Sequence, residues 1–370
     1  MPRAAAVIDL AAAHHNIGVM AARAGDAELM AVVKAEGYGH GMVQVARVAR
    51  EAGVAWLGVA LPSEALELRA AGDTGRILAW LWAAGEPDVA ECVAADVDLS
   101  VSSLAALEEI AAAAKSLGLR ARVHLKVDTG LSRNGVPESD WAVVISALAS
   151  SDDVEVVGIW SHLSSADVIG TTSVATQRAV FERAIAMAEA AGLVNLKRHL
   201  GNTATVLAYP DCQYDIVRVG IGIYGVSPNP EMGTASDLGL RPVMTLRAKL
   251  AGIKRIEAGA SVSYGETWTA AESTLIGLIP IGYADGVPRS ASNRAHVSVN
   301  RRTYPIVGTV AMDQFMVDLA QNPDGLAVGD DVVLFGRDGD PVEVWAEHAG
   351  TIGYEVVTRI APRVPRIYES

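Results

Sequence analysis

The chain has 370 residues, 51% of them hydrophobic, and a formal net charge of -13. This length allows two domains with sizeable cores, and the hydrophobic content indicates a globular protein rather than a disordered one. An acidic chain without any run rich in lysine and arginine is a poor partner for nucleic acid, so that class of function is disfavoured.

Neither a membrane segment nor an exported, disulfide-rich protein is indicated. No stretch approaches the roughly 20 apolar residues of a membrane span, and Asp9, His14 and His15 interrupt the segment that a secretory signal would keep apolar. Cys92 and Cys212 lie far apart in sequence, which favours neither a disulfide framework nor a zinc site. We therefore expect a cytoplasmic protein that has no membrane partner.

Short apolar runs, often β-branched, alternate with alanine-rich segments of helical period from the N-terminus to about Gly225. The runs predict eight strands, at 29–34, 56–60, 76–82, 97–102, 121–127, 154–162, 197–200 and 215–219. The segments between them predict helices such as 42–52, 63–71, 103–117, 139–149 and 172–191. Several of these helices open on a serine or threonine that can cap the first turn.

Eight strand-helix units in roughly 200 residues are typical of a (β/α)8 barrel, an α/β fold whose active sites lie at the C-terminal ends of the strands. A doubly wound sheet is the alternative, but no Gly-x-Gly-x-x-Gly follows the first strand. Beyond about Leu240, β-rich runs are separated by clusters of Asn, Asp, Gly and Pro, which predicts a mostly antiparallel β domain. We place the barrel at 12–238 and the β-rich C-terminal domain at 239–370.

Lys34 ends the first predicted strand, in the segment Ala-Val-Val-Lys-Ala-Glu-Gly-Tyr-Gly-His-Gly. A lone lysine at a strand end most often extends its ammonium into water. An amine at the mouth of an apolar strand layer can also lose its proton more easily and attack a carbonyl. The other strand ends decide between these interpretations.

Polar residues follow several of the predicted strands. Those at the ends of the first, fifth, sixth, seventh and eighth strands are Lys34 and Tyr38, then Lys126, Asp128 and Arg133, then His162, then Asn202 and Thr203, and finally Arg218, Gly220 and Gly222. Barrels commonly bind phosphate at the loops after strands seven and eight. A lysine, an anion cradle and cationic and imidazole partners together suggest pyridoxal phosphate, held as a Schiff base on Lys34.

At this point the sequence resembles the alanine racemases over nearly its whole length. The lysine segment is similar to that family's Lys-Ala-x-x-Tyr-Gly-His-Gly signature. Further motifs recur in order, among them 125–133, 202–203, 218–225, 262–265, 281–286, 312–314, 354–355 and 363–366. The resemblance implies a pyridoxal-phosphate-dependent isomerase that interconverts L-alanine and D-alanine on an external aldimine and supplies D-alanine for peptidoglycan.

The resemblance also implies a homodimer with shared active sites, in which residues 1–11 form a strand that pairs with the C-terminal domain. Two bases would act on opposite faces of the substrate: Lys34, and Tyr264 contributed by the other subunit. Tyrosine is a poor base at neutral pH because its ordinary pKa is near about 10, so Tyr264 needs nearby positive charge or hydrogen-bond donors.

The remaining site residues are assigned by the same resemblance. The cofactor would be held by Lys34, Tyr38, Arg133, His162, Asn202, Thr203, Arg218, Gly220, Ile221 and Tyr354. Arg133 and Met312 would bind the substrate carboxylate, with support from Asp313 and from Lys126, which is often carbamylated in this family and otherwise would be an ammonium facing Asp128. The access corridor would be lined by Asp167, Tyr283, Arg289, Ile352 and Tyr354, and the resemblance implies no metal.

The sequence departs from the family pattern at several positions. Glu36-Gly37 replaces the commoner Asn-Ala, and Ser132 stands where glycine is usual. Thr309 occupies a corridor position that often carries arginine, and Ala311 one that often carries cysteine. The changes at Thr309 and Ala311 leave the central chemistry intact and are expected to affect the corridor or the dimer contacts.

Other functions remain open from sequence. A racemase of serine or of a broader amino-acid set is the closest competitor. A barrel-type decarboxylase shares this architecture and cofactor, but it needs a cysteine-bearing motif near its C-terminal domain. A non-catalytic cofactor-binding protein would not need the β domain that bears Tyr264.

Overall fold

The computed structural model describes residues 2–370, which form two compact units. One unit contains residues 16–37 and 42–223, and the other contains the N-terminal residues to His15, a short piece at 38–41, and residues 224–370. The chain passes between the units inside helix α1 (Leu10–Ala24). The predicted boundary at 238/239 stays a prediction; by contacts, the segment from Tyr224 onward belongs with the C-terminal residues.

The first unit is a barrel of parallel strands. Over the described residues the sheet order is β8-β7-β6-β5-β4-β3-β2-β9, with every neighbouring pair parallel. The strands are β2 (Glu28–Val32), β3 (Trp56–Val59), β4 (Arg76–Ala79), β5 (Asp98–Val101), β6 (Ala121–Lys126), β7 (Val154–Trp160), β8 (Lys197–His199) and β9 (Ile216–Val219). A parallel bridge between Asn202 and Arg218 joins the ends of β8 and β9, so the sheet nearly closes on itself. The predicted barrel is confirmed, and the doubly wound alternative is wrong.

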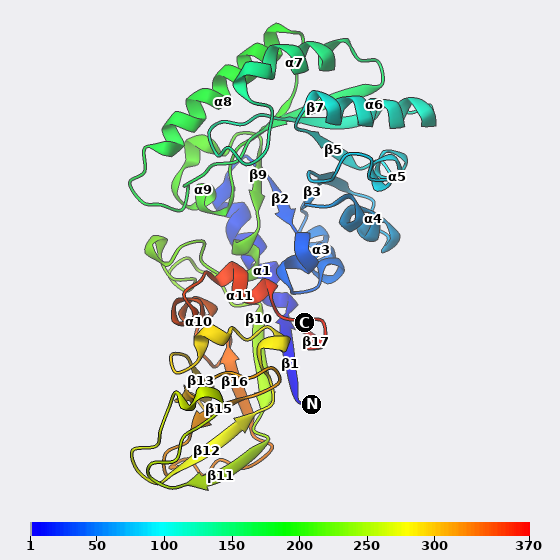
Figure 1. Cartoon of the computed structure of the whole chain (residues 1–370). Helices are drawn as coiled ribbons and strands as arrows, with labels where there is room; N and C mark the ends of the chain where they lie inside the picture. Colours follow the sequence, from blue (N-terminus) through cyan, green and yellow to red (C-terminus); the bar gives the residue numbers. More distant parts are fainter. Residues whose placement is uncertain (1) are drawn as a thin grey trace. The chain divides into compact units, whose positions relative to one another are not determined.

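Helices cover the outside of these strands (Figure 1). They are α3 (Met42–Glu51), α4 (Pro62–Ala70), α5 (Asp88–Ala94), α6 (Leu104–Leu117), α7 (Trp141–Ser150), α8 (Ser173–Ala190) and α9 (Thr203–Ala208). Ser103 caps α6 as predicted, because its side chain accepts from the amide of Ala106. Thr172 precedes α8 without a side-chain cap, and at α4 the capping acceptor is the carboxylate of Glu64.

The second unit is built on a mostly antiparallel sheet. Within residues 2–370 its order is β11-β12-β15-β14-β13-β16-β10-β1-β17. The strands are β1 (Ala4–Asp9), β10 (Met244–Lys249), β11 (Gly252–Ile256), β12 (Thr274–Ile279), β13 (His296–Val299), β14 (Arg302–Val307), β15 (Phe315–Asp318), β16 (Asp331–Phe335) and β17 (Arg366–Glu369). Strand β1 pairs antiparallel with β10 and parallel with β17. Helices α10 (Val342–Ala349) and α11 (Gly353–Thr358) complete the unit.

The predicted fold class, a (β/α)8 barrel followed by a mostly antiparallel β domain, is therefore confirmed. No helix within residues 2–370 combines the length and apolar composition that crossing a bilayer requires.

Candidate active site

Lys34 begins a short left-handed turn directly after β2. The segment α2 (Lys34–Tyr38) contains Ala35, Glu36 and Gly37 at φ values of 52°, 56° and 58°. Left-handed backbone is unfavourable for residues other than glycine, so the surroundings must hold this turn in place. The amide of Gly37 donates to the carbonyl of Val33 at 2.8 Å, which closes the turn behind the lysine.

The Glu64 carboxylate anchors this turn to the neighbouring strand-helix unit. It accepts from the backbone amides of Ala35 at 2.6 Å, Ala60 at 2.9 Å and Leu61 at 3.0 Å. Hydrogen bonds to a charged acceptor are among the stronger ones in proteins. Glu64 thereby joins the loop that carries Lys34 to the start of α4, a role that the sequence did not reveal.

The Lys34 amine lies in a setting that favours its neutral form. Burial and the positive charge of Arg133 lower its pKa, and Glu64 opposes them only in part. Its Nζ atom lies 5.9 Å from the centre of the Trp80 ring. A neutral amine is the form that attacks a carbonyl, so this is the environment expected of an imine-forming lysine rather than of a solvated one.

Lys126 ends β6 inside the barrel, 5% exposed. Burial lowers its pKa to about 8, and the charges of Arg218, Arg133 and Lys34 act in the same direction. Its Nζ atom lies 4.4 Å from the centre of the Trp160 ring. The described residues contain no Lys126–Asp128 ion pair within 4.0 Å.

Asp128 instead organises the loop after β6. One carboxylate oxygen accepts from the amides of Gly130 at 2.9 Å and Ser132 at 3.1 Å. Ser132 adopts φ 56°, a left-handed conformation for which glycine is better suited than serine. The exposed Arg133 follows directly, and its charge influences Lys34, Lys126 and His162.

Arg218, on β9, is buried. It belongs with Lys34, Lys126, Arg133 and His162, and we call these five residues the polar cluster. Nη2 of Arg218 donates to the carbonyls of Ser161 at 2.7 Å and Leu200 at 3.1 Å and faces Nδ1 of His162 at 3.3 Å. Burial lowers the pKa of Arg218, but guanidinium begins so basic that the group stays charged at neutral pH. Burial, followed by Arg218 and the neighbouring cations, holds the pKa of His162 well below its usual range, so that ring is neutral.

A chain of buried side chains continues from Arg218 away from this cluster. Nη1 of Arg218 faces Nδ1 of His199 at 3.2 Å, and Nε2 of His199 faces Nδ1 of His124 at 2.9 Å. Nε2 of His124 faces the Asp98 carboxylate at 3.1 Å. Sequence reasoning missed these three residues; the available signal was polar side chains inside strand segments that are otherwise apolar.

The predicted phosphate-binding residues lie at the ends of β8 and β9. Thr203 is buried, and its hydroxyl accepts from the amide of Gly220 at 3.2 Å. Ile221 follows in a short 3-10 turn. Asn202 caps α9 by accepting from the amide of Thr205 at 3.1 Å, so its observed role is structural. The barrel thus brings Thr203 together with Gly220 and Ile221, which closely follow Arg218 in the sequence.

In the second unit, Tyr38 packs among aromatic rings. Its ring stacks on Tyr224 with a centroid separation of 4.8 Å and lies 6.3 Å from Tyr354. Burial raises the pKa of Tyr38, so its hydroxyl stays protonated and can donate a hydrogen bond. The structure therefore brings together Tyr38 and Tyr354, the two tyrosines predicted to hold the cofactor.

Tyr264 protrudes from the second unit with 73% of its surface exposed. Its backbone is supported by Thr309, whose hydroxyl donates to the Tyr264 carbonyl at 2.8 Å, and Ser263 donates to the Thr309 carbonyl at 2.6 Å. Thr309 is buried, so here it supports the loop that presents the tyrosine.

Met312 and Tyr283 lie on two loops joined by backbone hydrogen bonds. The amides of Tyr283 and Ala284 donate to the carbonyls of Ala311 and Met312 at 3.1 Å and 3.0 Å. A Cβ at Gly282 would lie 2.3 Å from the Ala311 carbonyl oxygen, so this close approach requires glycine. The side chains of Met312, Tyr283 and also Ile352 are exposed.

The remaining predicted residues are placed as follows. Asp313 pairs with Arg363 at 2.5 Å, and Arg363 also pairs with the buried Asp285 at 2.6 Å. Arg289 begins a 3-10 turn in the second unit, and Asp167 lies in the loop after β7. Among residues 2–370, no group of His, Cys, Asp and Glu is arranged to hold a metal ion.

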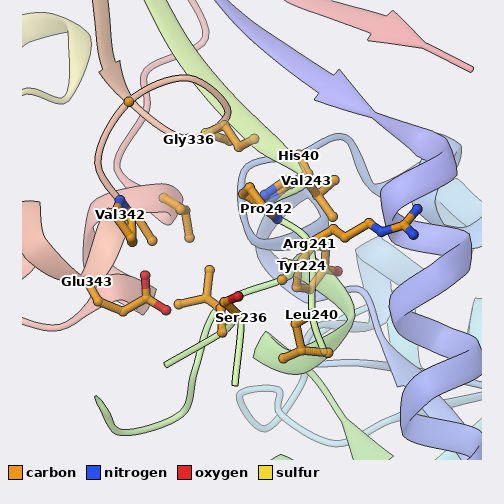
Figure 2. Close-up of a pocket in the computed structure, with 17 residues that line it drawn as sticks. His40, Tyr224, Ser236, Leu240, Arg241, Pro242, Val243, Gly336, Val342 and Glu343 are labelled. Atoms are coloured by element: carbon orange, nitrogen blue, oxygen red, sulfur yellow. The ribbon is translucent and has the colours of Figure 1, made fainter. Parts of the chain in front are cut away.

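The second unit also contains a largely apolar pocket of about 260 Å³ (Figure 2). Its lining includes Tyr224, Leu240, Val243 and Val342, with the Glu343 carboxylate at one side. The described residues that line it include none of the predicted site residues.

Comparison with known proteins agrees with this arrangement. Residues 8–228 match the alanine racemase N-terminal domain family, and residues 243–368 match the alanine racemase C-terminal domain family. The alanine racemase of Frankia casuarinae is 50% identical over 99% of this chain and 96% of that protein. The alanine racemase of Streptomyces coelicolor is 48% identical over 99% and 96%.

Solved structures give the same result. The alanine racemase from D-cycloserine-producing Streptomyces lavendulae superimposes with a TM-score of 0.97 at 47% identity, over 100% of this chain and 97% of that one. The Streptomyces coelicolor enzyme gives a TM-score of 0.96 at 48% identity, over 99% and 98%. This chain belongs to the alanine racemase family.

Proposed function

We propose that this protein interconverts L-alanine and D-alanine by moving the α-proton with the help of bound pyridoxal phosphate. The observation that carries the proposal is the Lys34 amine, whose pKa is lowered by burial and by Arg133 at the mouth of a barrel of this family. The D-alanine produced would serve peptidoglycan synthesis.

The barrel residues fit pyridoxal phosphate, the cofactor of this family. Lys34 offers an amine for covalent attachment, and Arg218 offers a buried cation. Both Nη groups of Arg218 already have acceptors within the barrel, so its Nε–H is the donor that remains for the pyridine nitrogen. The Thr203 hydroxyl and the backbone at Gly220 and Ile221 are suited to a phosphate. When bound, the cofactor supplies an electron-withdrawing ring that stabilises negative charge at the α-carbon.

Arg218 also determines how strongly that ring withdraws electrons. A guanidinium donates a hydrogen bond but keeps its proton, so it leaves a pyridine nitrogen unprotonated. His162 is neutral and cannot supply a proton there either. We infer that this favours prompt reprotonation of the α-carbon over side reactions such as transamination, and an Arg218→Glu variant should show more transamination.

We assign the two proton-transfer positions to Lys34 on one face of the substrate and to Tyr264 of the partner subunit on the other. In a single chain Tyr264 is exposed, as are Met312, Tyr283 and Ile352, which suits a surface that a second copy covers. Mixing inactive Lys34→Ala and Tyr264→Phe subunits should restore activity in the hybrid dimer, since one of its two sites would have both bases. A hybrid without activity would contradict a shared site.

Lys126 would act as a carbamate that orients Arg133 toward the cofactor and the substrate carboxylate. With a pKa of about 8, roughly a fifth of its amine is neutral at pH 7.4, against less than about 0.1% for an ordinary lysine. Neutral amine is the form that adds CO2 and releases a proton. The resulting anion would lie among the positive charges that now disfavour the ammonium.

The remaining assignments concern phosphate, carboxylate and access. Tyr38 and Tyr354 would contribute hydroxyls to the phosphate, Asn202 would support that region, and Met312, aided by Asp313, would bind the substrate carboxylate through its backbone. Tyr283, Arg289, Ile352 and Asp167 would line the access corridor and exclude large substrates. A cytoplasmic location is proposed as well, because Cys92 and Cys212 are buried free thiols, as in proteins of reducing compartments.

The proposed substrate is tested by a chiral assay of the purified protein with L-alanine and L-serine. We expect D-alanine to form faster than D-serine, because the corridor restricts the size of the substrate. Faster conversion of serine, or equal conversion of many amino acids, would identify the broader racemase instead. Release of CO2 from a basic amino acid would favour the decarboxylase.

A further inference from the structure

The interior of the barrel contains a continuous polar path that the catalytic assignments do not use. It runs from Arg218 on β9 through His199 on β8 and His124 on β6 to Asp98 on β5. The side chains of Asp98, His124 and His199 are fully buried. Barrel interiors are usually filled by branched apolar side chains, so a buried polar path needs an explanation.

Because the path runs from a group with only donors, Arg218, to a carboxylate with only acceptors, Asp98, its hydrogens can point in one direction only. Arg218 has only donors, so Nδ1 of His199 must accept. A neutral His199 then carries its proton on Nε2 and donates to Nδ1 of His124. His124 in turn carries its proton on Nε2 and donates to the Asp98 carboxylate. Burial holds the pKa of His199 well below its usual range, which agrees with a neutral ring.

Asp98 is fixed at the far end of the path. Arg122 donates to both of its oxygens, at 2.9 Å and 3.3 Å, and Arg76 lies at 3.5 Å. Burial tends to raise the pKa of Asp98, but the hydrogen bonds from His124 and Arg122 outweigh it and hold that pKa below its ordinary value. A charged Asp98 can accept hydrogen bonds but cannot donate one.

Packing holds both rings in the orientation that this path requires. The Trp160 ring stacks on His199 with an interplanar angle of 3°, and Trp56 meets His124 edge-on. A Cβ at Gly158 would lie 2.3 Å from Nδ1 of His124, so the glycine leaves room for the ring. The histidines therefore cannot simply turn over to exchange their donors and acceptors.

We propose that Asp98 is a positioning residue that fixes the tautomers of His124 and His199 and thereby the aim of the Arg218 guanidinium. An amide at position 98 could present its NH2 group to Nε2 of His124. The protons would then move to Nδ1 of both rings, and Nδ1–H of His199 would oppose an N–H of Arg218. The guanidinium would have to turn away. The expected effect on racemisation rests on the proposed function, whereas the assignment of the tautomers does not depend on it.

The first test is nitrogen NMR of the holoenzyme with labelled histidine. The chain has eight histidines, and His199→Gln and His124→Gln variants assign the two signals. The proposal expects both rings to be neutral with the proton on Nε2. A proton on Nδ1 of His199, or a doubly protonated ring, would overturn it. This measurement needs no variant at position 98 and no activity.

The second test compares Asp98→Asn with Asp73→Asn. Asp73 is a matched control, because it also lies between two arginines of the barrel, Arg50 and Arg69, but belongs to no part of the path. Asp98→Asn should change the histidine tautomers, shift the absorption of the bound cofactor and lower kcat about 10- to 100-fold, the range found for outer-shell residues that orient metal ligands. Asp73→Asn should keep the wild-type tautomers and absorption.

Unchanged tautomers and absorption in Asp98→Asn, with only a loss of thermal stability like that of the control, would show that Asp98 is merely structural. If Asp98→Asn does not fold, Arg122→Gln keeps the Asp98 carboxylate but loosens it. The absorption of the bound cofactor should then shift in the same direction by a smaller amount. An inactive wild-type enzyme with the expected tautomers would refute the proposed function and leave the positioning path intact.

Discussion

Replacing Lys126 with methionine should stabilise the cofactor-free protein at neutral pH when CO2 is absent. The buried amine has a pKa of about 8 against an ordinary value of 10.5, so keeping it charged in the folded state costs about 3 kcal/mol. Its contact with the Trp160 ring, at 4.4 Å from the centroid, returns about 1 kcal/mol. Methionine keeps most of the volume, which leaves a net gain of about 2 kcal/mol.

The pH dependence follows from the same shift. Below pH 8 both the folded and the unfolded wild-type chains hold the proton, and the full cost is present. Between about 8 and 10.5 the unfolded chain binds more protons than the folded one, so wild-type stability rises with pH relative to the variant. The advantage of Lys126→Met should therefore be greatest near pH 7 and should shrink toward pH 10.

Thermal unfolding followed by circular dichroism provides the measurement. A gain of about 2 kcal/mol corresponds to roughly 4 °C for a domain of about 220 residues. Adding bicarbonate should stabilise the wild type, because a carbamate would lie among Arg133, Arg218 and Lys34, and should leave the variant unchanged. A variant that is less stable than the wild type in CO2-free buffer, by an amount independent of pH, would refute this reasoning.

Other variants test the neighbouring parts of the site. Glu64→Gln should lower the pKa of Lys34 further, because it removes the negative charge that opposes burial and Arg133. The pH at which an aldehyde begins to modify the free amine should then be lower than in the wild type. A higher pH for this modification would contradict the assignment. Gly158→Ala should cost about 1–3 kcal/mol by crowding a buried ring, whereas Gly18→Ala, with open space around its Cβ position, should cost nothing; equal unfolding temperatures would argue against the packing. Tyr264→Phe should slow α-proton exchange in deuterated solvent mainly from one alanine enantiomer, and equal small losses from both would speak against two bases.

The strands could be predicted because a parallel barrel buries them on both sides, which leaves continuous apolar runs in the sequence. Each of the eight predicted runs overlaps a barrel strand, and the ends differ by a few residues, as between the predicted 154–162 and the observed β7 (Val154–Trp160). The extra residues, Ser161 and His162, belong to the loop that faces the polar cluster. Helix α4 begins with a proline and a glutamate acceptor instead of a serine cap, because tertiary contacts supply the acceptor.

The central site residues could be named because they follow strands, and strand ends in a barrel meet at one rim. What surrounds them could not be read from the sequence. The turn after Lys34 depends on Glu64, which is 30 residues away in the chain and reaches Ala35 only in the folded barrel. The Arg218 support through His199 likewise depends on β8 and β9 becoming neighbours when the barrel closes.

The departures from the family pattern have different outcomes. Glu36 and Ser132 both adopt left-handed backbone, so each places a side chain where glycine or asparagine is easier to accommodate. At Thr309 the sequence predicts a change in the access corridor or the dimer contacts, and the structure shows this residue supporting the loop of Tyr264. The identity of the residue at each position does not by itself show which positions have a strained backbone and which support a neighbouring loop.

Racemisation of L-alanine by the cofactor-loaded wild type, compared with Lys34→Ala loaded in the same way, tests the central claim most directly. We expect the wild type to produce D-alanine until the two enantiomers are equal, and Lys34→Ala to produce none above the rate of free pyridoxal phosphate. Absence of D-alanine from the loaded wild type, or undiminished racemisation by Lys34→Ala, would contradict the account.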